Sequence, residues 1–377
     1  MYTGSIASKI RVHASNIPGW HTNRKIVVIE SDDWGSIRTY NNEAYDQMLK
    51  AGLAVDANHY NAVDALESNE DLEMLFSFLS EFKDSTGRPP VFTPMCIMGN
   101  PDFDKIEASG FQEYHFQPLN ETLSTYPRHS KVLELWHKGK EARLFVPALH
   151  GREHLNVRRY MKLLQSGDTG MRVAFKHRSA GVSSYKGKAY PNYLGALHPE
   201  SKTEIRELHV YLEQAGELFR QYNGCVPTCF MAPNAEEPKE LETTLKKIGV
   251  RYLIRAKKRI YPLGDGTFKT EWNYTGRKNE LGQTILTRNC FFEPVCWGEH
   301  AYVSDWVDNC LKEISIAFWW NKPAVISSHR VNYIGYIDPK NREKGLAALR
   351  RLLKAILYQW PETEFMTTEE LGNQIPH

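Results

Sequence analysis

Three short clusters of ionisable residues have the types and spacing to do chemistry. Asp32 and Asp33 lie in ESDDWG after the apolar run KIVVI, His150 and His154 lie in HGREH after RLFVPAL, and His329 lies in SSHRVNY after PAVI. In α/β folds the active site forms at the carboxyl ends of the strands. We therefore expect these side chains to meet at one end of a sheet or barrel.

Each cluster suggests its own chemistry. Adjacent carboxylates that leave a buried strand repel each other and are costly to desolvate unless a cation lies beside them. Two His residues four apart share one face if a helix starts there, and neutral imidazole is a good zinc ligand. A His at the end of a late strand suits a general acid. Taken singly, the Asp pair is more typical of a loop start or a cap, and each His cluster is equally typical of a capping or satisfied structural His. The prediction therefore depends on their conjunction.

The elements that must position these residues alternate between short β-rich runs and longer stretches of helical period. This order is typical of βα units around a parallel sheet or barrel. The predicted strands are 25–30, 91–98, 142–149, 228–232, 251–255, 285–292 and 324–328. The predicted helices are 70–82, 131–138, 155–164, 203–222, 239–248, 305–320 and 342–360.

The organisation predicts a single domain over residues 1–377 with insertions. Residues 176–202 are rich in Gly, Ser, Pro and Tyr and have no clear period, which predicts a long loop; loops of that length are usually functional or disordered. The C-terminal helix 342–360 carries one apolar stripe. No internal repeat or low-complexity tract divides the chain.

Composition limits the class of protein. Hydrophobic residues make up 41% and charged residues 24%, as in soluble globular proteins. The formal net charge of +2 is spread without basic blocks, which argues against a nucleic-acid partner. Neither a transmembrane run nor the apolar stretch of a signal peptide is present, so the sequence favours a cytoplasmic protein. The six irregularly spaced Cys residues predict reduced thiols, with Cys225 and Cys229 buried rather than ligating.

The order DD, then H-x-x-x-H, then the strand FMAP, then a late strand ending in His resembles the polysaccharide deacetylase (NodB-homology) family from about Lys25 to Tyr333. The resemblance implies an α/β fold built as a distorted (β/α) barrel of about seven parallel strands. It implies that Asp32 is the catalytic base, that Asp33, His150 and His154 bind a divalent metal, and that His329 is the general acid. The implied metal is Zn²⁺, with Co²⁺, Ni²⁺ or Mn²⁺ as alternatives.

The sequence departs from the family pattern at its third motif. Met231 stands where the family has an Arg that contacts the base, and Asn234 stands where it has a Tyr. We therefore expect Arg152 or Arg330 to tune Asp32. The backbone N–H of Asn234 is a candidate oxyanion donor.

Aromatic residues near the clusters are candidate sugar contacts. Trp34 and Trp297, and Tyr185, Tyr190 and Tyr193 of the long loop, offer stacking faces for sugar rings, although packing is the commoner use of such residues.

The implied function is removal of an acyl group, N-acetyl above all, from a carbohydrate by an activated water. Three alternatives remain open: a metal-dependent amidase or deformylase acting on a small amide, a non-catalytic carbohydrate-binding protein on the same fold, and a glycoside hydrolase using Asp32 with Glu153 or Glu293. The glycosidase leaves the two spaced His residues unexplained.

Overall fold

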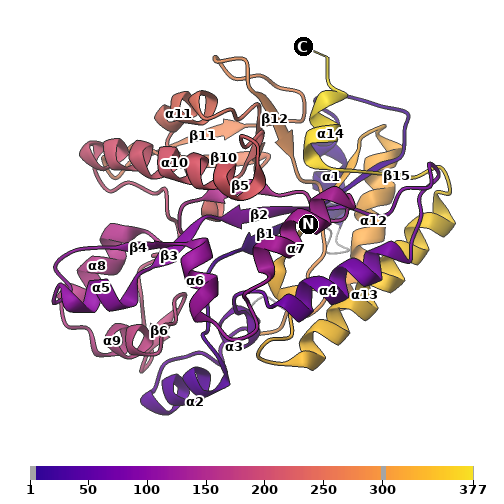
Figure 1. The fold of residues 1–377 in the computed structure, drawn as a ribbon. Coiled ribbons are helices and arrows are strands. Elements are labelled where there is room, and N and C mark those ends of the chain that lie inside the picture. Colours follow the sequence, from indigo (N-terminus) through magenta and orange to yellow (C-terminus); the bar gives the residue numbers. More distant parts are fainter. Residues whose placement is uncertain (1–5, 299–302, 377) are drawn as a thin grey trace.

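The computed structural model describes residues 6–298 and 303–376. Its centre is one parallel sheet with the strand order β12-β9-β8-β5-β2-β1-β14-β13, and β15 pairs with β1 beside that path (Figure 1). These strands are β1 (Ile26–Trp34), β2 (Phe92–Ile97), β5 (Ala148–Gly151), β8 (Cys229–Phe230), β9 (Tyr252–Arg255), β12 (Thr284–Thr287), β13 (Cys290–Phe291), β14 (Ala324–His329) and β15 (Glu364–Met366).

The two ends of this strand order are joined directly by the chain. β12 ends at Thr287 and β13 begins at Cys290, so only Arg288 and Asn289 lie between them. The first half of this extended segment pairs with β9 and the second half pairs with β14. Residues 284–291, here called the seam, thus close the sheet into a distorted barrel. The predicted α/β class and barrel are confirmed.

Helices surround the sheet, with α4 and α13 side by side on one flank and α10 on the other (Figure 1). The longer ones are α1 (Ile6–Ser15), α2 (Asn42–Ala51), α4 (Asn69–Ser80), α7 (Val132–Glu141), α8 (Val157–Gln165), α9 (Thr169–Lys176), α10 (Lys202–Asn223), α12 (Trp306–Trp319) and α13 (Pro339–Gln359). The shorter ones are α3 (His59–Val63), α5 (Phe103–Ala108), α6 (Leu119–Thr125), α11 (Glu242–Lys247), α14 (Thr368–Asn373) and the 3-10 turns η1 (Pro233–Ala235), η2 (Lys239–Leu241) and η3 (Arg330–Asn332).

The central strands are apolar runs because helices cover the outer face and side chains fill the inner one. Every residue of β1 and β2 is buried, and so are the first five of β14. Such continuous burial is typical of parallel strands. β1 pairs with β14 from Val27–Ala324 to Asp32–His329. The register therefore brings two of the three predicted clusters together at one end of adjacent strands.

Several predicted elements have different boundaries in the structure. The predicted strand 142–149 begins only at Ala148, because Ala142 ends α7 and Pro147 interrupts the run. The predicted strand 285–292 is divided at Arg288, where the seam changes partners. The sequence did not predict three small antiparallel strand pairs: β3–β4 (Gly99–Pro101, Phe116–Pro118), which flank α5, and the hairpins β6–β7 (Ser184–Tyr185, Lys188–Ala189) and β10–β11 (Lys258–Pro262, Phe268–Trp272).

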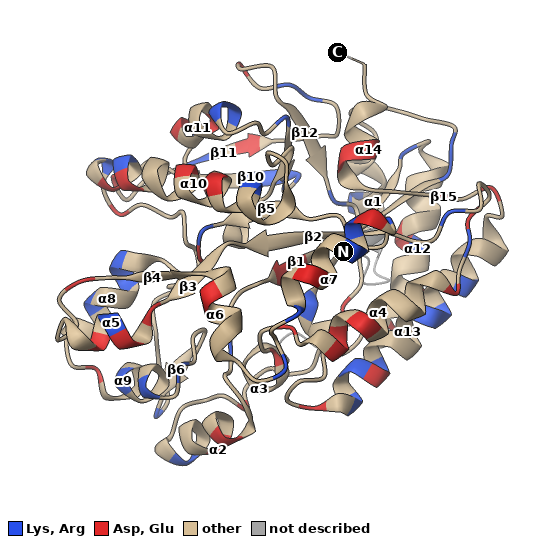
Figure 2. Ribbon diagram, viewed as in Figure 1, with Lys and Arg blue, Asp and Glu red and all other residues tan. Residues whose placement is uncertain are grey.

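The predicted loop 176–202 connects α9 to α10 and contains only the short hairpin β6–β7. Tyr193 anchors it, since the Tyr193 hydroxyl accepts from the Gly181 N–H and donates to the Val182 carbonyl. Acidic and basic residues are interspersed over the ribbon (Figure 2). Among the described helices, none is both long and apolar enough to cross a lipid bilayer.

Candidate active site

A β-bulge turns both carboxylates of the Asp pair into the same cavity. In a regular strand neighbouring side chains point to opposite faces. Here the register between β1 and β2 shifts between Ser31 and Trp34, and Asp33 has a left-handed φ of 78°. That conformation costs about 1–2 kcal/mol for a residue other than Gly. As a result, Asp32 and Asp33 line one cavity instead of two faces.

Buried contacts on either side of Asp33 hold the bulge. The Ser36 backbone N–H and hydroxyl both donate to the Asp33 carbonyl, at 3.2 and 2.8 Å. The Trp34 indole N–H donates to the Ser31 hydroxyl at 2.9 Å, and its ring packs edge-on against Phe145. Trp34 is fully buried and stays outside the cavity, so its contacts are with the core and not with a sugar ring.

Asp33, His150 and His154 meet as one group of three possible metal ligands, whose ligand atoms all lie within 4.8 Å of one another. Asp33 Oδ1 lies 3.0 Å from His154 Nε2 and 3.7 Å from His150 Nε2. No helix starts at His150, so the two His residues do not share a helix face. His150 lies in β5, and His154 lies in the turn before α8. Gly151, with φ of 136°, redirects the chain between them.

The chemistry of these donors fits a divalent metal ion. His150 Nδ1 lies 2.8 Å from the Met231 carbonyl, so it carries the proton and leaves Nε2 with a free lone pair facing Asp33. His154 Nδ1 is buried without a hydrogen-bond partner among the described residues. One carboxylate with two neutral imidazoles is a typical catalytic zinc set. Burial raises the pKa of Asp33, but the nearby His154 and Arg38 hold it well below its usual value.

Arg288, from the seam, clamps Asp32. Its two terminal nitrogens contact the two carboxylate oxygens of Asp32, each at 2.6 Å, and its Nε contacts Glu30 Oε2 at 2.6 Å. Such bidentate contact fixes the carboxylate plane. Burial raises the pKa of Asp32, and the Arg288 charge and hydrogen bonds outweigh it, so the pKa is lowered. Asp32 is therefore ionised and oriented.

His329 faces Asp32 from the adjacent strand. Its Nε2 lies 3.8 Å from Asp32 Oδ2, and its Nδ1 lies 2.7 Å from Glu293 Oε1. Asn332 donates to the other oxygen of Glu293 at 2.7 Å, which holds that carboxylate in place. Burial lowers the pKa of His329, but Glu293 above all, then Asp32 and Asp33, raise it to about 10. His329 is therefore protonated at neutral pH.

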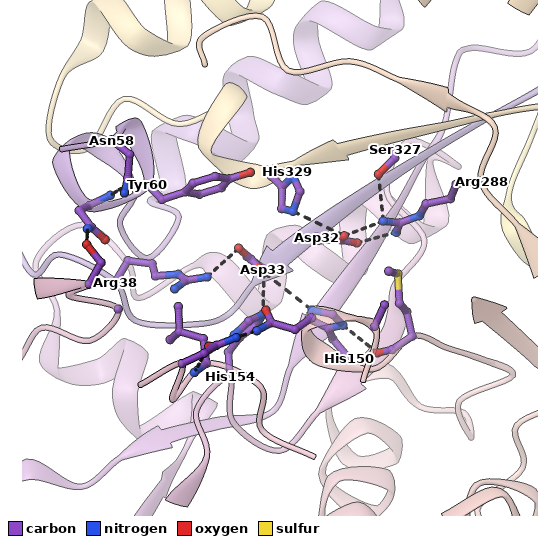
Figure 3. Close-up of a pocket in the computed structure, with 18 residues that line it drawn as sticks. Asp32, Asp33, Arg38, Asn58, Tyr60, His150, His154, Arg288, Ser327 and His329 are labelled. Atoms are coloured by element: carbon purple, nitrogen blue, oxygen red, sulfur yellow. Dashed lines mark hydrogen bonds and ion pairs between the residues drawn. The ribbon is translucent and has the colours of Figure 1, made fainter. Parts of the chain in front are cut away.

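These side chains surround a cavity of about 600 Å³ (Figure 3), here called the Asp33 cavity. Arg288 and Ser327 lie on one side of the Asp pair, and Arg38, Asn58 and Tyr60 lie on the other. Arg38 donates to Asp33 Oδ2 at 3.1 Å. The long loop contributes Gly181, Ser183, Asn192 and Leu194 to the wall. Asn234, in its left-handed turn with φ of 57°, also lines the cavity.

Seven residues predicted to serve the substrate or Asp32 do not line this cavity: Trp34, Trp297, Tyr185, Tyr190, Tyr193, Arg152 and Arg330. Trp297 is 37% exposed. Arg152 pairs with Glu153 and stacks on Tyr211, while buried Arg330 pairs with Asp64 and Glu67. The contact to Asp32 expected of Arg152 or Arg330 comes from Arg288 instead. Both predicted arginines neutralise their own buried carboxylates, which explains why neither is available.

Sequence reasoning missed Arg288 and Arg38 at the site. The signal for Arg288 was present, because a charged residue interrupts the apolar run 285–292 where a buried strand was expected. Arg38 carries no comparable signal, since it follows the bulge in an irregular segment. Glu293 was considered only as a glycosidase carboxylate, whereas the structure places it on the far nitrogen of His329.

Comparison with known proteins gives likeness in structure alone. No protein-family model matches the sequence, and no curated protein matches it. A protein assigned as a polysaccharide deacetylase from Mycobacterium smegmatis is similar over 95% of this chain and 92% of its own, at 11% identity and a TM-score of 0.43. A 4-alpha-glucanotransferase from Thermococcus litoralis is similar over 94% and 41%, at 9% identity and 0.48. A CE4 family pseudoenzyme from Bacillus anthracis is similar over 93% and 66%, at 10% identity and 0.38.

Proposed function

We propose that this chain is a divergent member of the polysaccharide deacetylase (NodB-homology) family. Its reaction is the metal-dependent hydrolysis of an acyl group, N-acetyl above all, from a carbohydrate. One observation carries the proposal: a buried set of one carboxylate and two imidazoles lies directly beside an ionised, clamped Asp32 and a protonated His329. A base, an acid and a metal set in one cavity are the parts that amide hydrolysis needs.

Asp33, His150 and His154 would hold the metal, with Zn²⁺ as the expected ion and Co²⁺, Ni²⁺ or Mn²⁺ as alternatives. When bound, such an ion supplies Lewis-acid polarisation of the acyl carbonyl and acidifies water in the site. Arg38 contacts the second oxygen of Asp33, and so leaves Oδ1 facing the two His residues.

The remaining steps belong to side chains around the Asp pair. Asp32 accepts the proton of the attacking water, and Arg288 keeps its carboxylate ionised and in plane. His329 donates a proton from Nε2 to the departing amine, since Glu293 occupies Nδ1. Asn234 is proposed to stabilise the developing oxyanion through its backbone N–H.

The glycoside hydrolase alternative finds little support in these contacts. Neither Glu153 nor Glu293 is among the residues that line the Asp33 cavity. Glu153 is bound by Arg152, and Glu293 is held by His329 and Asn332. Among the described residues that line the cavity, the other carboxylate is Asp33, which contacts Arg38, His150 and His154 and so does not serve as the acid that a glycosidase requires.

Metal analysis tests the central assignment. We expect the purified wild type to bind about one Zn²⁺ per chain, and Asp33→Ala and His154→Ala to lose it. Asp46→Ala and His137→Ala, two exposed positions outside the cavity, are the matched controls and should retain it. Equal metal content in all five proteins would disprove the metal site.

Acetate release tests the reaction and separates the alternatives. N-acetylglucosamine oligosaccharides and small N-acetyl amides are compared as substrates of the metal-loaded protein. Release from the sugars supports a carbohydrate deacetylase, whereas release from small amides alone supports an amidase. Asp32→Asn should keep the metal and lose turnover. Sugar binding with no turnover in the metal-loaded wild type would identify a binding protein instead.

A further inference from the structure

A second cavity of about 630 Å³ lies directly against the Asp33 cavity. The two cavities share Met231, Ala235, Arg288 and Ser327 as common lining residues. Arg288 therefore forms part of both walls while its guanidinium clamps Asp32. The two cavities therefore adjoin, with Arg288 in the wall of each.

The ionisable side chains that line the second cavity, here called the basic cavity, all carry positive charge. Five cationic residues line it: Arg11, Arg255, Lys257, Lys258 and Arg288. None of the described lining residues is Asp or Glu. Two of the five form ion pairs with carboxylates that do not line the basic cavity. Arg255 pairs with Glu237 and Glu242, and Arg288 pairs with Glu30 and Asp32.

The other three cations, Arg11, Lys257 and Lys258, have no ion pair among the described residues, and they come from separate segments. Arg11 lies on α1, and Lys257 and Lys258 lie where the chain enters β10. Convergence of unpaired cations on one concave surface costs free energy through their mutual repulsion, and an anion offsets that cost.

Lys257 is the most informative of these cations. It is partly buried, and among the described residues its ammonium donates to two neutral oxygens, Ser15 Oγ at 3.0 Å and Asn16 Oδ1 at 3.3 Å. Burial lowers the pKa of Lys257 to about 8. The ammonium of a surface Lys is fully hydrated, whereas that of Lys257 has lost part of its hydration at a cost in free energy. An anion that accepts a hydrogen bond from this ammonium would offset that cost.

An aromatic face completes the site. Trp272, at the end of β11, lines the basic cavity and is 68% exposed. An indole that is exposed beside cations suits stacking on a planar ring, such as a nucleobase.

We propose that the basic cavity binds a phosphate or diphosphate carried by the substrate, so that the acylated sugar occupies the Asp33 cavity and its anionic substituent lies beyond Arg288. This inference rests on the proposed deacetylase function for the sugar half. The phosphate chemistry is common to a sugar 1-phosphate and to a nucleoside diphosphate sugar. A neutral polysaccharide would leave the cations of the basic cavity unused.

Calorimetric titration of the full-length, metal-loaded chain with inorganic phosphate tests the anion site apart from catalysis. Lys257→Met with Lys258→Met should weaken phosphate binding at least about tenfold, since each removes a charge-assisted contact. Lys269→Met, an exposed Lys of the same β10–β11 hairpin outside the cavity, is the matched control. Unchanged affinity in the double variant overturns the inference. Loss of phosphate binding in Asp33→Ala also overturns it, because the anion would then bind at the metal site.

Two further probes identify the source of the phosphate. Uridine diphosphate that binds more tightly than phosphate, and loses this advantage in Trp272→Ala, supports a nucleotide-linked sugar. Equal affinities support a sugar phosphate.

Acetate release from N-acetylglucosamine 1-phosphate and from its neutral methyl glycoside then separates the two proposals. Turnover of the neutral glycoside with no phosphate binding leaves the deacetylase and removes the basic-cavity proposal. Phosphate binding with no turnover of either sugar leaves the anion site and removes the deacetylase proposal.

Discussion

Arg288 grips Asp32 through two parallel hydrogen bonds of 2.6 Å, one to each carboxylate oxygen. The Arg comes from the two-residue link between β12 and β13, and the Asp comes from β1. The link that closes the barrel therefore also carries the side chain that orients the proposed base. Displacing the seam would move the guanidinium that holds Asp32.

Removing this grip should reduce turnover without removing the metal. In Arg288→Met the carboxylate loses its planar partner, and misplacement of a catalytic group by about 1 Å costs roughly 100-fold in rate. We expect kcat to fall about 100-fold while metal content stays at the wild-type level. Arg288→Lys should recover little, because an ammonium cannot bind both oxygens in plane. Wild-type kcat in both variants would contradict a positioning role for Arg288.

Glu293 should set the alkaline limit of activity through His329. The raised pKa of His329, about 10, means that the folded state holds this proton more tightly than the unfolded chain. Its contribution to stability is complete below an unfolded pKa of about 6.5 and is lost as the pH rises through the folded value. In Glu293→Gln the pKa of His329 falls, so the alkaline limb of kcat/KM should move toward neutral pH.

The control for Glu293→Gln is Glu43→Gln on α2, an exposed carboxylate away from the cavity, which should leave the profile unchanged. An alkaline limb at the same pH in wild type and Glu293→Gln would rule out His329 as the acid under Glu293 control.

The bulge at Asp33 should depend on the hydrogen bond between Trp34 and Ser31. Both side chains are fully buried, so Ser31→Ala leaves the indole N–H without an acceptor, at a cost of about 1–3 kcal/mol of unfolding free energy. Trp34→Phe in the Ser31→Ala background should cost less than it does in the wild type, since the unpaired donor is removed. Urea unfolding of the four proteins measures this coupling, and strict additivity would contradict it.

Lys257 should lower the stability of the chain at neutral pH. Its pKa of about 8, below the ordinary 10.5, means that the folded state binds this proton less tightly than the unfolded chain. The unfavourable contribution is complete below about pH 8 and vanishes above about pH 10.5, so stability from this group rises with pH between them.

Lys257→Met removes the buried charge and keeps most of the volume. Its Tm should exceed that of the wild type at pH 7, and the difference should shrink as the pH approaches 10. Lys269→Met is again the matched control. A Tm difference that is constant across this range would show that the ammonium of Lys257 is not penalised by burial.

The sequence alone predicted the α/β class and several residues of the candidate site, because these predictions depend on local signals. Periodicity located α4, α7, α8, α10, α11, α12 and α13 closely but missed the helices α5, α6 and α9 between them, and short apolar runs located most strands of the barrel. The clusters at Asp33, His150 and His329 were found because parallel strands place their carboxyl ends on one side of a sheet.

The tertiary structure alone decided how these residues are oriented and paired. Whether Asp32 and Asp33 face one cavity depends on the left-handed conformation of Asp33, which Asp adopts more readily than most residues but which its presence in the sequence does not specify. Arg288 replaces the arginine expected from position 152 or 330 because the seam brings it to Asp32 across 256 residues of chain. Such a partner depends on the register and closure of the sheet, which are long-range properties that local sequence does not specify. The sequence alone therefore identifies the Asp pair, whereas the contact of Arg288 with Asp32 depends on the fold.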